Sequence, residues 1–165
     1  MAEFCDIYDI NRNKTGRLHE RGKPDMGDGD CLLIVFVWIM NGKGEFLISK
    51  RAAKGRFFGM WQTTGGCAIA GDDSLSAALR ETKEELGITL DPKNGQLLKQ
   101  YNEDRNLFDV WFFRQDIDIS EVVLQPGETC DAMWASKEKI KQMIDEGVFW
   151  GEWSPYLDGL NIQNI

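Results

Sequence analysis

The sequence predicts an α+β fold in which helices pack on the faces of a mixed sheet. Strand-like segments occur in two blocks, and each block is followed by a stretch of helical periodicity, without the regular alternation of a parallel α/β protein. The apolar run 31–40 is about half as long as a bilayer span requires, so we expect a buried strand there. With 165 residues, the chain is expected to form a single domain over 1–165.

The first block supplies the strands of the N-terminal half. Its strand-like segments are 3–11, a short stretch that ends at His19, 31–40, 45–51 and 57–64. The first two are expected to be joined by a turn at 13–16, and the Gly- and Asp-rich segment 21–30 is expected to be a loop. An Asn-Gly pair at Asn41 and Gly42 separates the next two and predicts a hairpin. The last segment runs into the pair Gly65 and Gly66.

One helix precedes the second block of strands, and another follows it. Over 73–86 the apolar side of the helical wheel is formed by Leu75, Ala78, Leu79, Thr82 and Leu86. Asp72 or Asp73 is suited to cap its start, and Gly87 to end it. Strands are expected at 96–101, 107–115 and 130–135, followed by an amphipathic helix at 136–146.

Composition excludes several classes of partner. The formal net charge of -8 argues against a binder of nucleic-acid polymers, which needs a basic surface, and it repels small anions unless a metal cation mediates the contact. No apolar segment is long enough to cross a membrane, and no secretory signal is visible, so the expected location is cytoplasmic. The four dispersed cysteines disfavour a disulfide framework or zinc site, and the single histidine, His19, is expected in a turn or at the surface.

Three glutamates share one side of the first helix. Glu81 and Glu85 are one turn apart, and Glu84 lies beside them, so like charges repel near a helix end that favours cations. A solvated acidic face is one interpretation. The alternative is a site for a hard cation such as Mg²⁺, which binds carboxylate oxygens. Arg80 stands next to these acids and is suited to hold one carboxylate through a bidentate pair.

The segment 66–88 resembles the signature of the Nudix hydrolase family, G-x(5)-E-x(7)-R-E-U-x-E-E-x-G-U, where U is a bulky aliphatic residue. The matching positions are Gly66, Arg80, Glu81, Glu84, Glu85, Gly87 and Ile88. Two positions depart from it: Asp72 replaces the first glutamate, and Thr82 replaces an aliphatic residue. The resemblance implies a Nudix-type α-β-α sandwich with this box as a loop-helix-loop. It also implies hydrolysis of a diphosphate linkage in a small phosphorylated metabolite, with Mg²⁺ or Mn²⁺ as cofactor.

The same resemblance implies roles for individual residues. Glu81 and Glu85 would be the principal metal ligands, Glu84 would bind the metal or a water on it, and the Gly66 carbonyl is a weaker candidate. The general base in this family is variable, either a box glutamate or an acid from a later loop. Glu128 is our candidate in the later loop, with Asp131 and Glu103 as rivals.

Substrate contacts are sought upstream of the box. Lys50, Arg51, Lys54 and Arg56 form a basic cluster that is either a phosphate grip or a solvated strand end. Phe57, Phe58 and Trp61 are suited to stack on a nucleobase, although aromatic residues in strands more often belong to a core, where we place Trp38 and Trp111. Cys67 is interpreted as a small residue without a chemical role.

Two other functions compete with the hydrolase. The segment from Leu18 to Trp61 is similar to the isopentenyl-diphosphate-isomerase-like branch, but Gly65 stands where those enzymes have a catalytic cysteine, and their metal-binding histidines are missing. A Nudix domain that only senses a metabolite is the other alternative, and the retained box acids favour an enzyme over it. The leaving group is left open, and the family resemblance makes a homodimer plausible.

Overall fold

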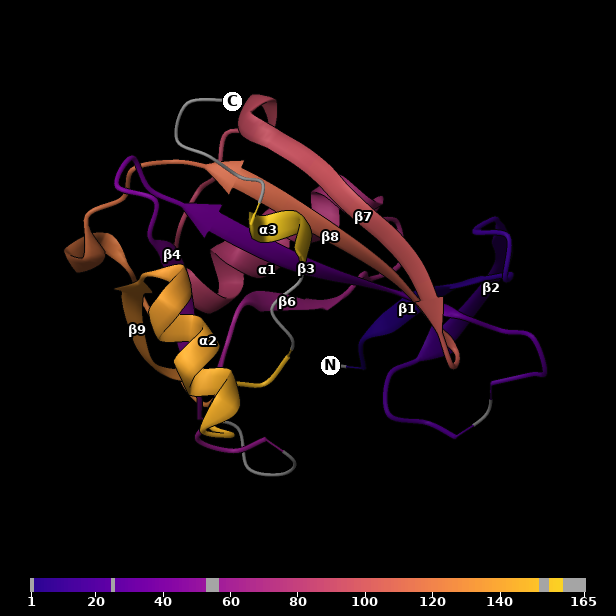
Figure 1. Cartoon of the computed structure of the whole chain (residues 1–165). Helices are drawn as coiled ribbons and strands as arrows, with labels where there is room; N and C mark the ends of the chain where they lie inside the picture. Colours follow the sequence, from indigo (N-terminus) through magenta and orange to yellow (C-terminus); the bar gives the residue numbers. More distant parts are fainter. Residues whose placement is uncertain (1, 25, 53–56, 152–154, 159–165) are drawn as a thin grey trace.

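The structure is a computed structural model that describes residues 2–24, 26–52, 57–151 and 155–158. Figure 1 shows a twisted sheet between helices. The elements in chain order are β1 (Phe4–Tyr8), β2 (Lys14–Glu20), β3 (Leu32–Met40), β4 (Phe46–Arg51), β5 (Trp61–Gln62), β6 (Thr64–Cys67), α1 (Ser74–Leu86), β7 (Gly95–Glu103), β8 (Asn106–Arg114), β9 (Thr129–Ala135), α2 (Lys137–Asp145) and α3 (Pro155–Asp158). Short 3-10 turns lie at Pro92–Asn94 and Ile119–Glu121.

The large sheet is mixed, as the sequence predicts. Its main path runs β5-β4-β3-β8-β7, with β6 paired to β3 and β9 paired to β4. The β3–β8 pair is parallel, and the other pairs of this sheet are antiparallel. The strands β1 and β2 form a separate hairpin. Since α1 and α2 cover opposite faces of the large sheet, the predicted α+β sandwich is confirmed (Figure 1).

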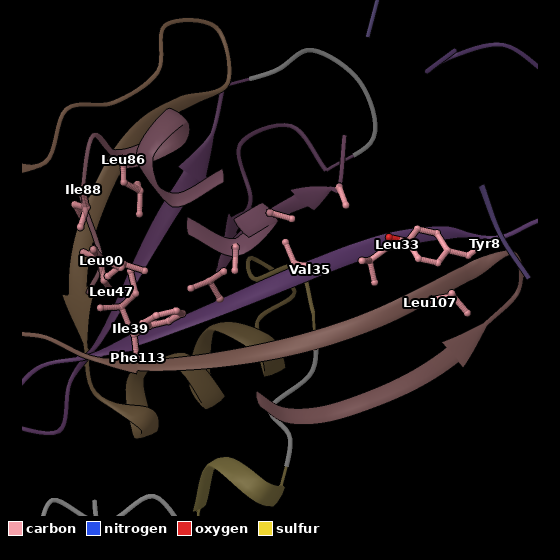
Figure 2. Packing of buried hydrophobic residues seen from close by; sticks show 14 of the residues in the cluster. Tyr8, Leu33, Val35, Ile39, Leu47, Leu86, Ile88, Leu90, Leu107 and Phe113 are labelled. Atoms are coloured by element: carbon pink, nitrogen blue, oxygen red, sulfur yellow. The ribbon is translucent and has the colours of Figure 1, made fainter. Parts of the chain in front are cut away.

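The strand β3 divides the core into two parts. On one face, Val35, Val37 and Ile39 pack against α1 and the apolar segment that follows it (Figure 2). On the other face, Trp38 and Met40 pack with residues of β4, β8 and α2. Because successive side chains of a strand point to opposite faces, a single strand supplies a β-branched wall on one side and an aromatic wall on the other.

The helix α1 begins and ends where the sequence predicts. The Asp73 carboxylate accepts a hydrogen bond from the Ser76 backbone N–H, and the Ser76 hydroxyl accepts one from the Asp73 N–H, which completes a capping box. Gly87 ends the helix at a φ of 72°, a left-handed conformation that favours glycine. Thr82 is fully buried, and its hydroxyl donates to the Ala78 carbonyl, so its place on the apolar side is confirmed.

Two local predictions were wrong. The first hairpin turns around Ile10 to Arg12 and not at 13–16, because the Asp9 carboxylate accepts from the backbone N–H of both Asn11 and Asn13. The hairpin predicted at Asn41 and Gly42 is confirmed, because β3 and β4 pair antiparallel at Met40 and Phe46 and the Asn41 N–H donates to the Glu45 carbonyl; beyond that point β6 occupies the edge of β3.

The second wrong prediction is the continuous strand at 57–64. Residues 57–59 form a turn, and the short strands β5 and β6 follow it. Phe57 has a φ of 70°, which interrupts any extended strand at this point. The helix α3 was not predicted. Among the described residues, no helix is long and apolar enough to cross a bilayer.

Candidate active site

Two of the three box glutamates are buried beneath the sheet. Glu81 and Glu85 each expose 8% of their surface, and both lie on the side of α1 that contacts β6. Glu84 lies toward solvent, with 47% of its side chain exposed. A solvated acidic face therefore describes Glu84 alone, and the burial of two like charges on one helix calls for a compensating positive charge.

Arg80 supplies part of that charge. Its guanidinium donates to three carboxylates, at 3.0 Å from Asp72, 3.0 Å from Glu81 and 2.9 Å from Glu84. A fourth hydrogen bond of 3.1 Å runs from Nη2 to the carbonyl oxygen of Cys67. We expected one bidentate pair and find instead a cation that joins three acids to the loop before the helix. Asp72, the departure from the signature, is therefore part of this network.

Glu85 lies deeper and has different partners. Its carboxylate accepts from the Thr64 hydroxyl and from the Gly65 backbone N–H. Burial, and to a smaller extent the charge of Glu81, raise its pKa to about 7 against the opposing effects of Thr64, Gly65 and Arg51. Burial also raises the pKa of Glu81, which Arg80 opposes. The pair therefore titrates closer to neutrality than ordinary glutamates.

The two glycines before the helix allow the chain to approach its neighbours closely. A Cβ atom added to Gly65 would lie 2.1 Å from the Val35 carbonyl oxygen. A Cβ atom added to Gly66 would lie 2.5 Å from the carboxyl carbon of Glu81. Because both positions are glycines without a Cβ atom, β6 can run directly against β3 and over the acids of α1. The Gly66 backbone therefore lies close to the Glu81 carboxylate.

The donor set suits a hard divalent cation. In the described ranges, no three His, Cys, Asp or Glu side chains converge as they would around a bound metal, and the carboxylates of Glu81 and Glu84 are both turned to Arg80. Nevertheless, Mg²⁺ commonly binds through one or two carboxylates and completes its shell with water and substrate oxygens. Glu81, Glu85 and the nearby Gly66 backbone supply such oxygens, so the residues fit the cation.

Arg51 extends the site away from the helix. It ends β4, and its Nη1 donates to the Gln62 side-chain oxygen at 2.6 Å. Its Nε is buried and lacks a hydrogen-bond acceptor within the described residues. The guanidinium carbon lies 5.7 Å from the ring centre of Trp150, and its charge lowers the pKa of Glu85. Arg51 therefore stands between the buried acids and the aromatic side of the sheet.

An aromatic cavity occupies that other side. It has a volume of about 410 Å³, and its lining includes Phe36, Trp38, Tyr101, Phe108, Phe149 and Trp150. The Tyr101 and Phe108 rings are stacked with centres 4.8 Å apart, and Phe36 stacks on Phe108 at 5.7 Å. Sequence reasoning missed this cavity, whereas its placement of Trp38 in the core is confirmed, since Trp38 is buried. The available signal was the alternation of Phe36 and Trp38 along β3.

The other predicted substrate residues have mixed positions. Lys50 lies on β4 with its Nζ 5.9 Å from the ring centre of Trp61. Trp61 packs into the α2 side of the core, and Phe58 is 64% exposed in the turn at 57–59. Neither aromatic residue belongs to the cavity lining. Arg56, like Lys54, falls outside the described residues.

The candidate bases are also separated by the fold. Glu128 is exposed in the turn before β9, and its neighbour Thr129 donates from its hydroxyl to the Glu85 carbonyl at 3.0 Å, so this turn adjoins the end of α1. Asp131 is exposed on β9 opposite Lys50. Glu103 lines the aromatic cavity, on the sheet face opposite α1, which removes it from the helix acids.

Comparison with known proteins agrees with these features. The family description NUDIX domain matches residues 32–152. A Nudix hydrolase of Listeria innocua is 36% identical over 149 residues, which cover 89% of this chain and 88% of that protein. The crystal structure of DR0079 from Deinococcus radiodurans superposes with a TM-score of 0.76 at 19% identity, covering 95% and 98% of the two chains.

A second solved structure shares the fold over a smaller part. It is a bifunctional NMN adenylyltransferase/ADP ribose pyrophosphatase from Francisella tularensis in complex with AMP and a Mn ion. The TM-score is 0.57 at 20% identity, and the match covers 74% of this chain and 38% of that one. The match to the NUDIX domain covers well over half of the chain, and with the close relative it shows that this protein belongs to the Nudix family.

Proposed function

We propose that this protein is a pyrophosphohydrolase that cleaves a diphosphate linkage in a small nucleotide-type substrate and depends on Mg²⁺ or Mn²⁺. Membership of the family supports the reaction class. The observation that carries the rest is the alignment of buried Glu81 and Glu85, the adjacent Arg51 and the aromatic cavity. This arrangement offers oxygen donors for a cation, a positive charge for a phosphate, and rings for a planar group.

Glu81, Glu85 and the Gly66 carbonyl would hold the divalent cation. When bound, such a cation neutralises the diphosphate and lowers the pKa of a water molecule. Arg80 keeps Glu81 and Asp72 in place through its hydrogen bonds and restrains Glu84. With such a cation held there, the acidic chain would present a positive site to an anionic substrate in spite of its net charge of -8.

A carboxylate must accept the proton of the attacking water. Glu84 is suited to this role because it is exposed beside the buried pair, and Arg80 holds its position. Glu85, with a pKa raised to about 7 by burial, is the other box candidate. Glu128, in the turn at the end of α1, is the candidate from the later loop.

The phosphates and the leaving group would extend from the acids toward the cavity. Arg51 has an unsatisfied buried Nε and faces both Glu85 and Trp150, so it is suited to bind a phosphate oxygen and to fix the direction of the chain. A planar base would then stack on the rings of Phe36, Tyr101 and Phe108. The AMP and Mn in the F. tularensis protein are compatible with this assignment.

The isomerase alternative finds less support. Such an enzyme requires a cysteine at the position of Gly65, where a Cβ atom would lie 2.1 Å from a backbone oxygen of β3. The sensor alternative predicts binding of a nucleotide without turnover. The two remaining possibilities, enzyme and sensor, are therefore separated by a turnover assay.

The test is a substrate panel of nucleoside diphosphate sugars, dinucleotides and nucleoside triphosphates, scored for release of phosphate or nucleoside monophosphate. We expect turnover with Mg²⁺ or Mn²⁺ and none with a chelator. Glu85→Gln should lower the rate at least about 100-fold on the best substrate, while the exposed Glu138→Gln on α2 should leave it unchanged. Full activity of Glu85→Gln would overturn the ligand assignment, and binding without turnover in the unaltered protein would select the sensor.

A further inference from the structure

Two of the dispersed cysteines meet in space. Cys5 on β1 and Cys67 on β6 are 62 positions apart, yet their sulfur atoms lie 3.4 Å from each other. All four cysteines are free, and the other two, Cys31 and Cys130, have different partners. Cys5 is 1% exposed, and Cys67 is half-buried. From the sequence, Cys67 was interpreted as a residue without a chemical role because no activating group stands near it along the chain; Cys5 is distant in sequence and could not enter that interpretation.

The surroundings of the pair favour thiol chemistry. The adjacent Cys67 thiol and the positive charge of Arg21 lower the pKa of the Cys5 thiol, whereas the contact with Cys5 and burial raise the pKa of Cys67, so Cys5 is the member of the pair suited to ionise. His19, expected at the surface, is only 6% exposed and stands opposite Cys5 across the hairpin. Cross-strand partners in an antiparallel pair have their Cβ atoms about 5 Å apart on the same face. The charge of Arg21 therefore acts on the Cys5 sulfur, and His19 faces Cys5 across the hairpin.

The position of the pair links it to the active-site loop. Cys67 directly follows Gly66, and its carbonyl oxygen accepts the hydrogen bond from Arg80. The hairpin already contacts the loop beyond it, since the Phe4 carbonyl accepts from the Ala70 N–H at 2.7 Å and the Asp6 carboxylate from the Gly71 N–H at 2.9 Å. The cysteine pair thus lies where the β1–β2 hairpin braces the loop that precedes α1.

We propose that Cys5 and Cys67 form a reversible intramolecular disulfide that fastens the β1–β2 hairpin to the Nudix box when the protein meets a hydroperoxide. One thiolate attacks the peroxide oxygen, the O–O bond breaks, and a sulfenic acid and an alcohol (water from H₂O₂) result. The second sulfur attacks the first, the S–S bond forms, the S–O bond breaks, and the hydroxyl leaves as water with the second thiol's proton. Two thiols are oxidised and one peroxide is reduced.

The change needed in the fold is small. The sulfurs must approach by about 1.4 Å to reach the length of an S–S bond. A bond between residues 62 positions apart closes a long loop, and such closure destabilises the unfolded chain more than closure of a short loop. The oxidised protein is therefore expected to melt about 5 °C or more above the reduced protein.

The experiment treats the fully reduced chain with one equivalent of H₂O₂. Intact mass should fall by two hydrogen atoms, peptide mapping should recover a cross-link between the Cys5 and Cys67 peptides, and dithiothreitol should reverse both changes. Cys5→Ser and Cys67→Ser should each abolish the cross-link, whereas Cys130→Ser, which alters an exposed cysteine, should retain it. Circular dichroism verifies that each variant is folded, and if one fails to fold, the other serves as the negative control.

Other outcomes would overturn the proposal. These are oxidation of Cys130 with Cys5 and Cys67 left as thiols, a cross-link between two chains, irreversible sulfinic acid at either position, or an intramolecular bond that leaves Tm unchanged. None of these measurements uses hydrolysis. A failure here is therefore distinguishable from a failure of the proposed enzymatic activity.

Discussion

The two faces of the central sheet differ in packing: one is filled by side chains, and the other holds a cavity. On the α1 face, Arg80 donates hydrogen bonds to Asp72 and Glu81, the Thr64 hydroxyl donates to Glu85, and Val35 and Val37 fill the space between helix and sheet. On the opposite face, the rings around Phe36 and Tyr101 enclose about 410 Å³ of space. Side chains held by hydrogen bonds are suited to catalysis, which requires fixed positions, and a cavity is suited to bind the variable part of a substrate. This division predicts different kinetic consequences for substitutions on the two faces.

The strongest test of the α1 face is Glu85→Gln. Because Glu85 is a proposed metal ligand, its loss should lower kcat by at least about 100-fold on every substrate, with the same ranking of substrates as before. Steady-state kinetics on two or more substrates measures this. A variant that lost one substrate and retained another would assign Glu85 to recognition, and the division between the faces would be wrong.

Arg80→Ala should have the next largest effect, and on two quantities. It leaves Asp72 and Glu81 without their cation at a site where Arg80 is only 18% exposed, so we expect a loss of about 2 kcal/mol in the free energy of unfolding. Turnover should fall about 10-fold or more as the carboxylates lose their positions. Urea unfolding and kinetics test both, with Lys83→Ala on the same helix as a control expected to change stability by under about 1 kcal/mol.

Tyr101→Ala tests the opposite face and should be milder. A stacked base loses about 1–3 kcal/mol when an aromatic partner is removed, so KM should rise roughly 10-fold for nucleotide substrates while kcat changes little. Leu97→Ala, on the same strand but outside the cavity lining, is the matched control. If Tyr101→Ala lowered kcat and left KM unaltered, the cavity would not be the site that binds the base.

The same contrast explains which features could be predicted from the sequence. The α1 segment is local, so its caps at Asp73 and Gly87 and the spacing of its acids are visible along the chain. The burial of Glu81 and Glu85 was not visible, because a helical wheel places them away from the apolar side. They are covered by β6, which crosses over the helix only because Gly65 and Gly66 lack side chains.

Apart from the alternation of Phe36 and Trp38 along β3, the aromatic cavity could not be predicted, because its walls are far apart in the chain. Phe36 comes from β3, Tyr101 from β7, Phe108 from β8 and Trp150 from the segment after α2. Only strand pairing brings them together, and propensity does not specify which strands pair. The contact of Cys5 with Cys67 has the same origin. For the same reason, Phe58 and Trp61, which were proposed to stack on a nucleobase because they are aromatic, do not line the cavity.

The smallest effect that separates the two faces is a pH dependence of stability without metal. Burial raises the pKa of Glu85 to about 7 from an ordinary value of 4.5, so between these values the folded protein retains a proton that the unfolded chain releases. Stability should therefore be greatest, with respect to this group, below about pH 4.5 and should fall as pH rises toward 7. Asp6, Asp73 and Asp118 have lowered pKa values and act in the opposite sense at more acid pH, outside this window.

Melting curves recorded with a chelator measure this effect. The Tm of the unaltered protein should decline from pH 4.5 to 7 relative to that of Glu85→Gln. Mg²⁺ should reverse the decline, because a cation that binds the ionised pair stabilises the folded state. Tyr101→Ala should retain the same pH slope as the unaltered protein, because its face of the sheet holds neither Glu81 nor Glu85. The opposite outcome is a Tm difference between the unaltered protein and Glu85→Gln that stays constant across this range. It would mean that Glu85 is ionised in the folded protein in the absence of metal, and that the α1 face does not need a cation to hold its charge.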